Sequence, residues 1–281
     1  MAPVTRFSWA QFCRRRLAVP GDHGGWALWL GPFAVGIGVA GGWNEALPLL
    51  FALGLAAFMV WQPAVIVVKA LAGRRSRADV MPALIWMLAY SSLIAAGSLA
   101  LTRAGHATVL WFGAPALPVL GWQLALVARR AERDHMGADI VGAGVLALAA
   151  PAAHAVVIGQ ITGTAWMLWA LCWFQSAAAV VFVFLRLAQR RLSEIPETSV
   201  RWRTGRRAML YHGFNVIGSL ALALLGFAPR LTVVPFAAMW VYAVYGVLRP
   251  AVGVRPTRLG FAQVGATVVF SVLLITAYRL A

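Results

Sequence analysis

The sequence predicts an all-α fold: a polytopic transmembrane helical bundle with about nine helices, its N-terminus cytoplasmic and its C-terminus external. Composition is the first reason, because 62% of the 281 residues are hydrophobic and only 11% are charged, and the mean hydropathy is +0.79. A soluble globule of this length needs more polar surface. The second reason is that long apolar runs alternate with short polar gaps. The third is that the cations collect in every second gap.

Nine apolar segments predict the helices. In chain order they cover residues 26–42, 47–68, 82–101, 108–127, 138–158, 164–187, 208–227, 231–248 and 259–278. Each approaches or exceeds the roughly 20 residues that a helix needs to cross the hydrocarbon layer. Tryptophans near segment ends, such as Trp43 and Trp111, fit an interfacial aromatic belt. Prolines such as Pro63, Pro82 and Pro235 are expected to start or kink helices.

The polar parts of the chain predict its domain organisation. Residues 1–25 are basic and lack a continuous apolar core, so they are expected to form a cytoplasmic tail rather than a signal peptide. Residues 26–281 are expected to form a single transmembrane domain, because no linker, low-complexity tract or repeat divides them. The longest polar gap, residues 188–207, is expected to be a cytoplasmic loop and suits a mobile surface loop or a lid.

The distribution of lysine and arginine predicts the orientation. Counted from the N-terminal tail, every second gap belongs to one set, and this set holds 21 of the 24 cations when Arg186, at the end of the sixth segment, is included. The positive-inside rule makes that set cytoplasmic. We therefore expect a multi-pass protein of a bacterial inner (plasma) membrane, surrounded by the lipid bilayer and in contact with anionic lipid head groups. The net charge of +16 is spread over these gaps without a basic, aromatic-interleaved motif, so nucleic acid is not an expected partner.

The first of three polar clusters surrounds Asp22 and His23, at the predicted cytoplasmic start of the first helix. Ionisable groups at a membrane edge usually face a cavity or a partner. Free backbone N–H groups and the helix dipole favour an anion at such a start, and the imidazole adds a donor or a proton acceptor. The same residues equally fit an Asp22 helix cap and a His23 ring among the lipid head groups.

The second cluster, Glu132, Arg133, His135 and Asp139, precedes the fifth segment. If that helix begins a turn early, Glu132, His135 and Asp139 share one face, which suits a divalent cation or a proton relay. Glu132 and Arg133 equally suit an interfacial ion pair. Asp139 is followed at once by apolar residues and is expected to enter the membrane.

The third cluster, Tyr211, His212 and Asn215, lies in the first turns of the seventh segment and repeats the His-Gly pair of the first. An ordinary polar contact between helices explains these residues equally well. Lys69 is the only lysine beside 23 arginines, and it terminates the second segment. It either pairs with an anion or snorkels to the interface.

The chain resembles the YwiC-like family of bacterial integral membrane proteins over about residues 20–278. The resemblance depends on the following residues: His23-Gly24-Gly25-Trp26-Ala27 leading into Gly31-Pro32-Phe33, Glu132-Arg133 followed by Asp139, Arg206-Arg207 with Tyr211-His212, and Leu248-Arg249-Pro250 with Arg255-Pro256 and Gly260. Family members usually carry Gln or Glu before the first His-Gly, whereas this chain has Asp22. The family has no established activity, so the resemblance implies a membrane fold without naming a reaction.

Nine helices with polar cytoplasmic loops also resemble, more remotely, the UbiA-type intramembrane prenyltransferases. Those enzymes hold a prenyl diphosphate through Mg²⁺ bound to two aspartate-rich loops, after the second and sixth helices. Here the first such loop offers Asp79 amid four cations, and the other offers Glu194 and Glu197. Mg²⁺ enters the interpretation only under this transferase alternative, because two metals need more carboxylates; otherwise the cofactor is unknown.

Two functional hypotheses follow. In the first, a cytoplasm-facing polar pocket binds or transports a small anionic or amphipathic substrate. In the second, the same pocket catalyses a UbiA-like transfer on an isoprenoid or lipid substrate, so the sequence does not decide whether the protein is an enzyme. The expected pocket residues are Asp22, His23, Lys69, Glu132, Arg133, His135, Asp139, Tyr211, His212 and Asn215.

Overall fold

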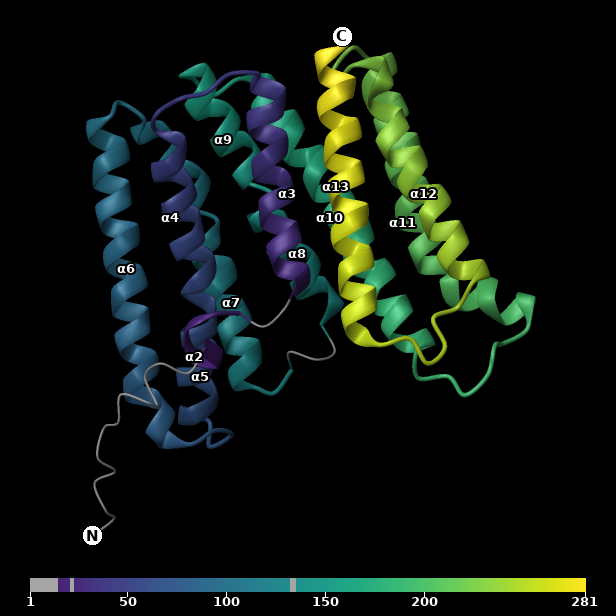
Figure 1. Ribbon diagram of the computed structural model, residues 1–281, viewed down its shortest axis with the longest axis horizontal. Coiled ribbons are helices and arrows are strands. Elements are labelled where there is room, and N and C mark those ends of the chain that lie inside the picture. Colours follow the sequence, from purple (N-terminus) through teal and green to yellow (C-terminus); the bar gives the residue numbers. More distant parts are fainter. Residues whose placement is uncertain (1–14, 21–22, 132–134) are drawn as a thin grey trace. The chain divides into compact units, whose positions relative to one another are not determined.

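The computed structural model describes residues 15–20, 23–131 and 135–281, and every predicted segment is helical within them (Figure 1). The α-helices are α2 (Arg15–Ala18), α3 (His23–Ala40), α4 (Leu47–Met59), α5 (Trp61–Leu71), α6 (Val80–Arg103), α7 (Ala116–Ala128), α8 (Met136–Leu146), α9 (Ala149–Ile158), α10 (Gly163–Gln189), α11 (Thr198–Leu224), α12 (Val233–Leu248) and α13 (Pro256–Arg279). Three short 3₁₀ segments accompany them: η1 (Arg77–Asp79), η2 (Ala107–Gly113) and η3 (Arg230–Thr232). The predicted all-α fold is therefore confirmed for the described part of the chain.

Seven helical stretches in the described residues are long and apolar enough to cross a membrane. They are Leu47–Leu71, Arg77–Arg103, Ala107–Ala128, Met136–Ile158, Gly163–Gln189, Arg230–Leu248 and Pro256–Arg279. The apolar part of α3, Gly24–Ala40, is shorter. Helix α11 is long enough at 27 residues, but its arginines and buried polar residues make it less apolar than the others.

Several helix boundaries differ from the prediction. Helix α11 begins at Thr198 rather than at residue 208, and α10 continues to Gln189, so the connection predicted over residues 188–207 shrinks to residues 190–197. The apolar criterion detects only the part of a helix that crosses hydrocarbon. Arginine is a good helix former, so the arginine-rich turns of α11 extend the helix beyond the apolar stretch. Similarly, α2 forms inside the predicted N-terminal tail, and α3 begins at His23 rather than Trp26.

The chain divides into two compact units. In the first, Asn44–Ala138 contributes α4 to α7 and the segment before residue 23 contributes α2. The Leu17 side chain of α2 is buried against Ile66 and Ala83, and the Tyr90 hydroxyl donates to the Ala18 carbonyl oxygen at 3.0 Å. The last residues of the predicted tail are thus part of the helical packing of this unit.

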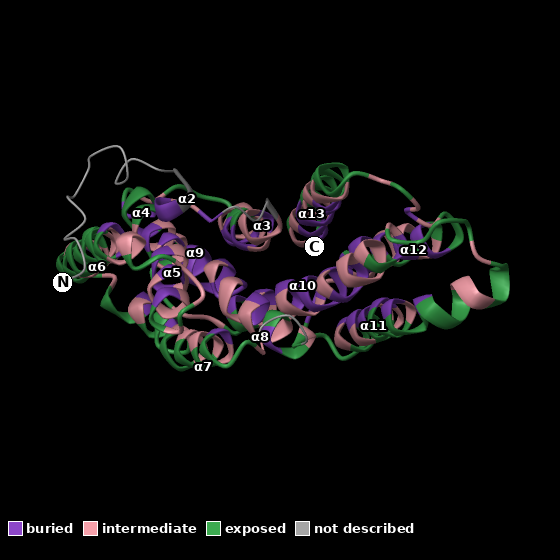
Figure 2. Cartoon of the chain, turned by 90° about the horizontal axis from the view of Figure 1, so that it is seen from below, coloured by how far each residue is buried: buried purple, intermediate pink, exposed green. Residues whose placement is uncertain are grey.

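The second unit contains His23–Trp43 and Asp139–Ala281, with α10 at its centre. Helix α10 contacts α3, α9, α11, α12 and α13, and Figure 2 shows it running between its neighbours with little exposed surface. The core of this unit includes Val35, Leu168, Phe236 and Leu274, from four different helices. Helix α3 therefore packs with the C-terminal helices, although residues 44–138 intervene in the sequence.

Glycine allows α3 to approach α9 closely. A Cβ atom on Gly36 would lie 2.2 Å from the Ala150 carbonyl oxygen and 2.9 Å from the Ala153 Cβ. Small residues let transmembrane helices touch backbone to backbone, where dispersion and weak polar contacts replace the hydrophobic effect. The α3–α9 interface is of this type.

Helices α8 and α9 form one predicted segment that is broken at Ala147 and Leu148. The Leu148 amide donates to the Val145 carbonyl at 3.1 Å instead of continuing the regular ladder. From α10, the Trp169 Nε1 donates to the Gly144 carbonyl oxygen and the Trp173 Nε1 to the Ile140 carbonyl oxygen, both at 2.9 Å. The two tryptophans therefore satisfy backbone carbonyls of α8 that face protein rather than water.

Within the second unit, the helix ends that the cation pattern assigns to one side of the membrane lie together. The Ala251 amide donates to Gln189 Oε1 at 3.3 Å, and Gly205 packs on Val247. The end of α10, the start of α11 and the end of α12 are thus together, and their connections are the arginine-rich ones. At the opposite end, Gly41 after α3 lies against Arg279 of α13. The prediction that this arginine-rich side is cytoplasmic stays a prediction.

Candidate functional site

The predicted pocket residues divide into those that the structure describes and those that it does not. Asp22, Glu132 and Arg133 lie outside the described residues, and His23 is placed as the first residue of α3. The remaining six are described with their side chains: Lys69, His135, Asp139, Tyr211, His212 and Asn215.

Three of these six residues are not on α11. Lys69 is partly buried in the last turn of α5, and His135 is exposed and precedes α8; both belong to the first unit. Because α8 begins at Met136, His135 does not share a helical face with Asp139. Asp139 is exposed in the first turn of α8, in the second unit. The predicted ten-residue pocket stays a prediction.

The other three predicted residues lie on α11, and two of them face inward. His212 and Asn215 are each 2% exposed, whereas Tyr211 is exposed. Every third or fourth residue of α11 is buried, which defines the buried stripe of this helix. The stripe consists of Gly205, Ala208, His212, Asn215, Ser219 and Ala223. Its small residues allow close packing, and its polar residues have to find partners inside the protein.

Asn215 finds such a partner and His212 does not. Asn215 Nδ2 donates to the Phe174 carbonyl oxygen of α10 at 2.9 Å. Both ring nitrogens of His212 are buried without a hydrogen-bond partner among the described residues, and the edge of its ring meets Phe182 at 6.1 Å between centroids. Gln175, next to Phe174, is also buried, and its Oε1 has no partner. Buried polar atoms are satisfied in most proteins, so unsatisfied ones mark a place that needs an explanation.

The end of α12 lies next to this stripe. Two arginines from neighbouring helices bond its last carbonyl groups, and the sequence does not predict these bonds. Arg186 Nη1 of α10 donates to the carbonyl oxygens of Gly246 and Arg249, both at 2.7 Å, and to Gln189 Oε1 at 3.0 Å. Arg201 Nη1 of α11 donates to the Leu248 carbonyl oxygen at 3.0 Å. The last carbonyls of a helix have no intrahelical donor, and these arginines supply one.

A sequence signal for this group existed in the spacing of α10. Phe182, Arg186 and Gln189 recur at helical intervals of four and three residues, in register with the buried residues of the same helix. In the cation pattern Arg186 belongs to the arginine-rich set, because a charge at the end of an apolar segment has the same appearance whether it faces lipid or protein. The structure shows that it is half-buried and bonded to α12.

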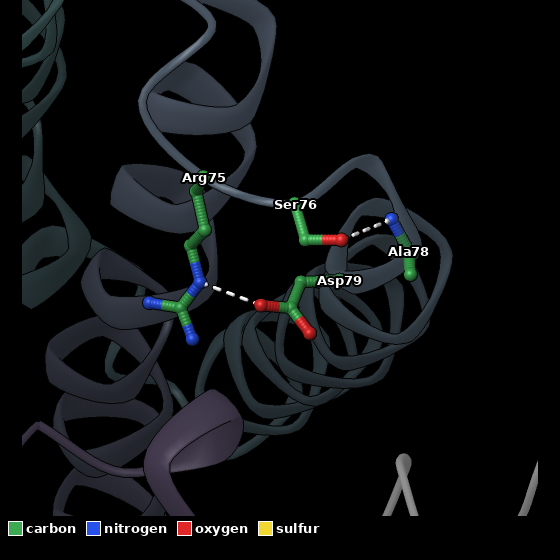
Figure 3. Close-up of polar contacts among 4 residues, drawn as sticks. All are labelled: Arg75, Ser76, Ala78 and Asp79. Atoms are coloured by element: carbon green, nitrogen blue, oxygen red, sulfur yellow. Dashed lines mark hydrogen bonds and ion pairs between the residues drawn. The ribbon is translucent and has the colours of Figure 1, made fainter.

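The connection after α5 corresponds in position to the first aspartate-rich loop of the UbiA-type enzymes, and it contains a local ion pair. Figure 3 shows Arg75 facing Asp79, with Nε 2.7 Å from Oδ2, while the Ser76 hydroxyl accepts from the Ala78 amide at 3.2 Å. The Asp79 carboxylate is therefore held by a cation of its own loop. Among the described residues, no three His, Cys, Asp or Glu side chains gather closely enough to hold a metal ion.

Replacing Asp79 with asparagine is expected to have a small effect on stability. The Arg75–Asp79 pair joins residues four apart whose side chains are 33% and 17% exposed, and ion pairs at this spacing contribute about 1 kcal/mol or less. The midpoint of thermal unfolding in detergent should stay within about 3 °C of that of the unaltered protein. A much larger decrease would show that Asp79 has a further partner.

Comparison with known proteins agrees with the resemblance seen in the sequence. A family model described as YwiC-like protein matches residues 19–154, which contain α3 to α8 and the first half of α9. No curated protein and no solved structure matches the chain. The match and the seven candidate spans together confirm the lipid bilayer as the environment of the protein. The chain is therefore a multi-pass membrane protein whose residues 19–154 match the YwiC-like family.

Proposed function

We propose that this protein, in a bacterial inner membrane, binds or transports a small anionic or amphipathic substrate. The substrate enters a polar site that opens to the cytoplasm where α10, α11 and α12 meet. The observation that carries the proposal is the burial of His212, which is 2% exposed and whose ring nitrogens have no partner in the part of the chain that the structure describes. The other pocket residues predicted from the sequence stay predictions.

The cost of burying His212 supports a role in binding. An unsatisfied buried donor or acceptor costs about 1–3 kcal/mol, and an apolar side chain of similar size would avoid that cost. A histidine at this position is useful when a ligand or a proton engages its ring. Asn215 and Gln175 add an amide donor and a free amide oxygen on the neighbouring turns.

The depth of His212 suits a site reached from the arginine-rich end. Gly205 packs on Val247 at the end of α12, and His212 is seven residues further along α11. At 1.5 Å per residue, the imidazole is about 10 Å deeper along the helix axis. On α10, Arg186 bonds the end of α12 and Phe182 meets the His212 ring, so a substrate that comes from that end to His212 would pass both.

The charge around this end favours an anion. Between residues 186 and 258, the predicted cytoplasmic connections and helix ends carry ten arginines and two glutamates. The arginines are Arg186, Arg190, Arg191, Arg201, Arg203, Arg206, Arg207, Arg249, Arg255 and Arg258. Such a field concentrates anions near the site and accelerates their association.

Replacing His212 with leucine is expected to abolish transport without unfolding the protein. Uptake of radiolabelled inorganic phosphate, acetate and glutamate into proteoliposomes identifies a transported probe. His212→Leu should lower its uptake by at least about tenfold, because the only unsatisfied imidazole of the stripe is lost. The thermal midpoint should be unchanged or higher, since a buried unsatisfied polar group is removed.

Leu210→Ala, on the exposed face of α11, is the matched control and should transport normally. Uptake by His212→Leu at the rate of the unaltered protein would refute the role of His212. If none of the probes is taken up and the protein instead consumes a prenyl diphosphate in the presence of Mg²⁺, the transferase alternative replaces the transport proposal.

A further inference from the structure

We infer that Arg186 binds a phosphate group, so that the end of α12 is the phosphate subsite of the proposed substrate path. This inference depends on the proposed function for its place in the path, but its evidence and its test are separate. The evidence is the hydrogen bonding, the charge balance and the aromatic surroundings of a single guanidinium group.

The guanidinium group of Arg186 is anchored through only one of its nitrogens. Nη1 makes all three of its bonds, to the carbonyl oxygens of Gly246 and Arg249 and to Gln189 Oε1. Within the described residues, Nε and Nη2 donate to no protein atom. A guanidinium group has five N–H donors in a fixed plane, so one edge of this group is held and the opposite edge stays available.

The charge of Arg186 is not compensated by a carboxylate of the described residues. It is half-buried at the end of an apolar helix, and it forms no ion pair with a carboxylate of the described residues. The acidic residues of the adjoining connection, Glu194 and Glu197, are both exposed. Charges at a membrane edge are normally paired, so the expected counter-ion of Arg186 is an anion from outside the chain.

The shape of the free edge selects the anion. The Nε and Nη2 atoms present two parallel N–H donors, which match two oxygens of a phosphate group and bind it more strongly than a single-point contact. Other arginines of the same end, such as Arg190 and Arg201, increase the affinity for a multiply charged group. A phosphate is favoured over a monocarboxylate because it offers more oxygens and more charge.

The surroundings of the guanidinium group suit an amphipathic ligand. Its Cζ lies 5.8 Å from the centroid of the Phe182 ring, and the Phe182 ring meets Tyr242 at 5.2 Å between centroids. On the outer side of α12, Tyr245 is 58% exposed. Aromatic residues at a membrane edge contact the region between head group and acyl chain. A phospholipid head group and a free phosphate share the chemistry that Arg186 recognises.

The test uses the purified full-length protein with Arg186→Lys and Arg191→Gln variants. Lysine keeps a cation and donors for the α12 carbonyls but loses the planar edge, so the helix end is expected to stay folded. Arg191 is exposed in the same connection, and its variant is the matched control. Native mass spectrometry measures bound phosphatidylglycerol, with phosphatidylcholine for comparison, and calorimetry measures the affinity for inorganic phosphate.

We expect the unaltered protein and Arg191→Gln to bind at least one of these phosphate probes and Arg186→Lys to bind it at least about tenfold more weakly. Loss of phosphatidylglycerol alone identifies a lipid as the source of the phosphate, and loss of inorganic phosphate identifies a soluble ligand. Equal binding by all three proteins, or no binding by any, would overturn the inference. Neither result depends on transport, so the role of His212 is tested independently.

Discussion

Gly36→Ala is expected to destabilise the second unit by roughly 2–3 kcal/mol, the usual cost of overpacking a tight interface. The new methyl carbon would lie 2.2 Å from the Ala150 carbonyl oxygen, which is a backbone atom and has no rotamer to change. One helix therefore has to move away from the other, and the small-residue contact between α3 and α9 is lost. The fraction of monodisperse protein after heating in detergent measures the effect.

Gly218→Ala is the matched control for this experiment. Gly218 is also a helical glycine of the second unit, but a Cβ atom added there would have no neighbour within 4 Å outside its own helix. Alanine in an open helical position should leave stability unchanged or raise it by about 0.5–1 kcal/mol. Equal thermal midpoints for Gly36→Ala and Gly218→Ala would refute the close contact between α3 and α9.

Trp173→Ala is expected to be the most destabilising substitution in α10, by about 3 kcal/mol. The Trp173 indole bonds the Ile140 carbonyl oxygen, packs over Gly144 and stacks on Trp169 with a centroid distance of 5.1 Å. All three contacts disappear with the ring. Without them, the N-terminal part of α8 loses its principal attachment to α10.

Trp173→Phe separates packing from hydrogen bonding in the same measurement. Phenylalanine keeps a stacking ring but has no N–H donor, so it should lose on the order of 0.5–1.5 kcal/mol. Thermal midpoints should therefore fall in the order unaltered protein, Trp173→Phe, Trp173→Ala. A phenylalanine variant as unstable as the alanine variant would show that the hydrogen bond, rather than the ring, holds α8.

The sequence was sufficient to predict where the helices lie, because apolar length is a physical requirement of the bilayer. It was less informative about where they break. Pro63 was expected to start or kink a helix, and α4 indeed ends at Met59, whose carbonyl a proline at 63 cannot bond. Pro151 stands in the same relation to Ala147, where α8 and α9 separate. Its alanine-rich surroundings form an uninterrupted apolar run in the sequence, so that break was not predicted.

The candidate site was predicted only in part, for a reason that lies in tertiary structure. Helical spacing places His212 and Asn215 on one face of α11, but it does not say which of them finds a partner on another helix. Phe174, whose carbonyl accepts from Asn215, is 41 residues away in sequence. Arg186 likewise acts on Gly246, 60 residues further on. Such pairs become visible only when the helices are packed.

The discontinuous make-up of the second unit has a consequence for how the protein is made. Helix α3 leaves the ribosome before its partners, since α9 begins at Ala149 and α13 at Pro256. Gly36 meets Ala150 of α9 and Gly38 meets Ile275 of α13, so neither glycine has its neighbour until those later helices have been made. The packing of α3 in the second unit is therefore completed only after α4 to α7 of the first unit have been made and α9 and α13 have followed.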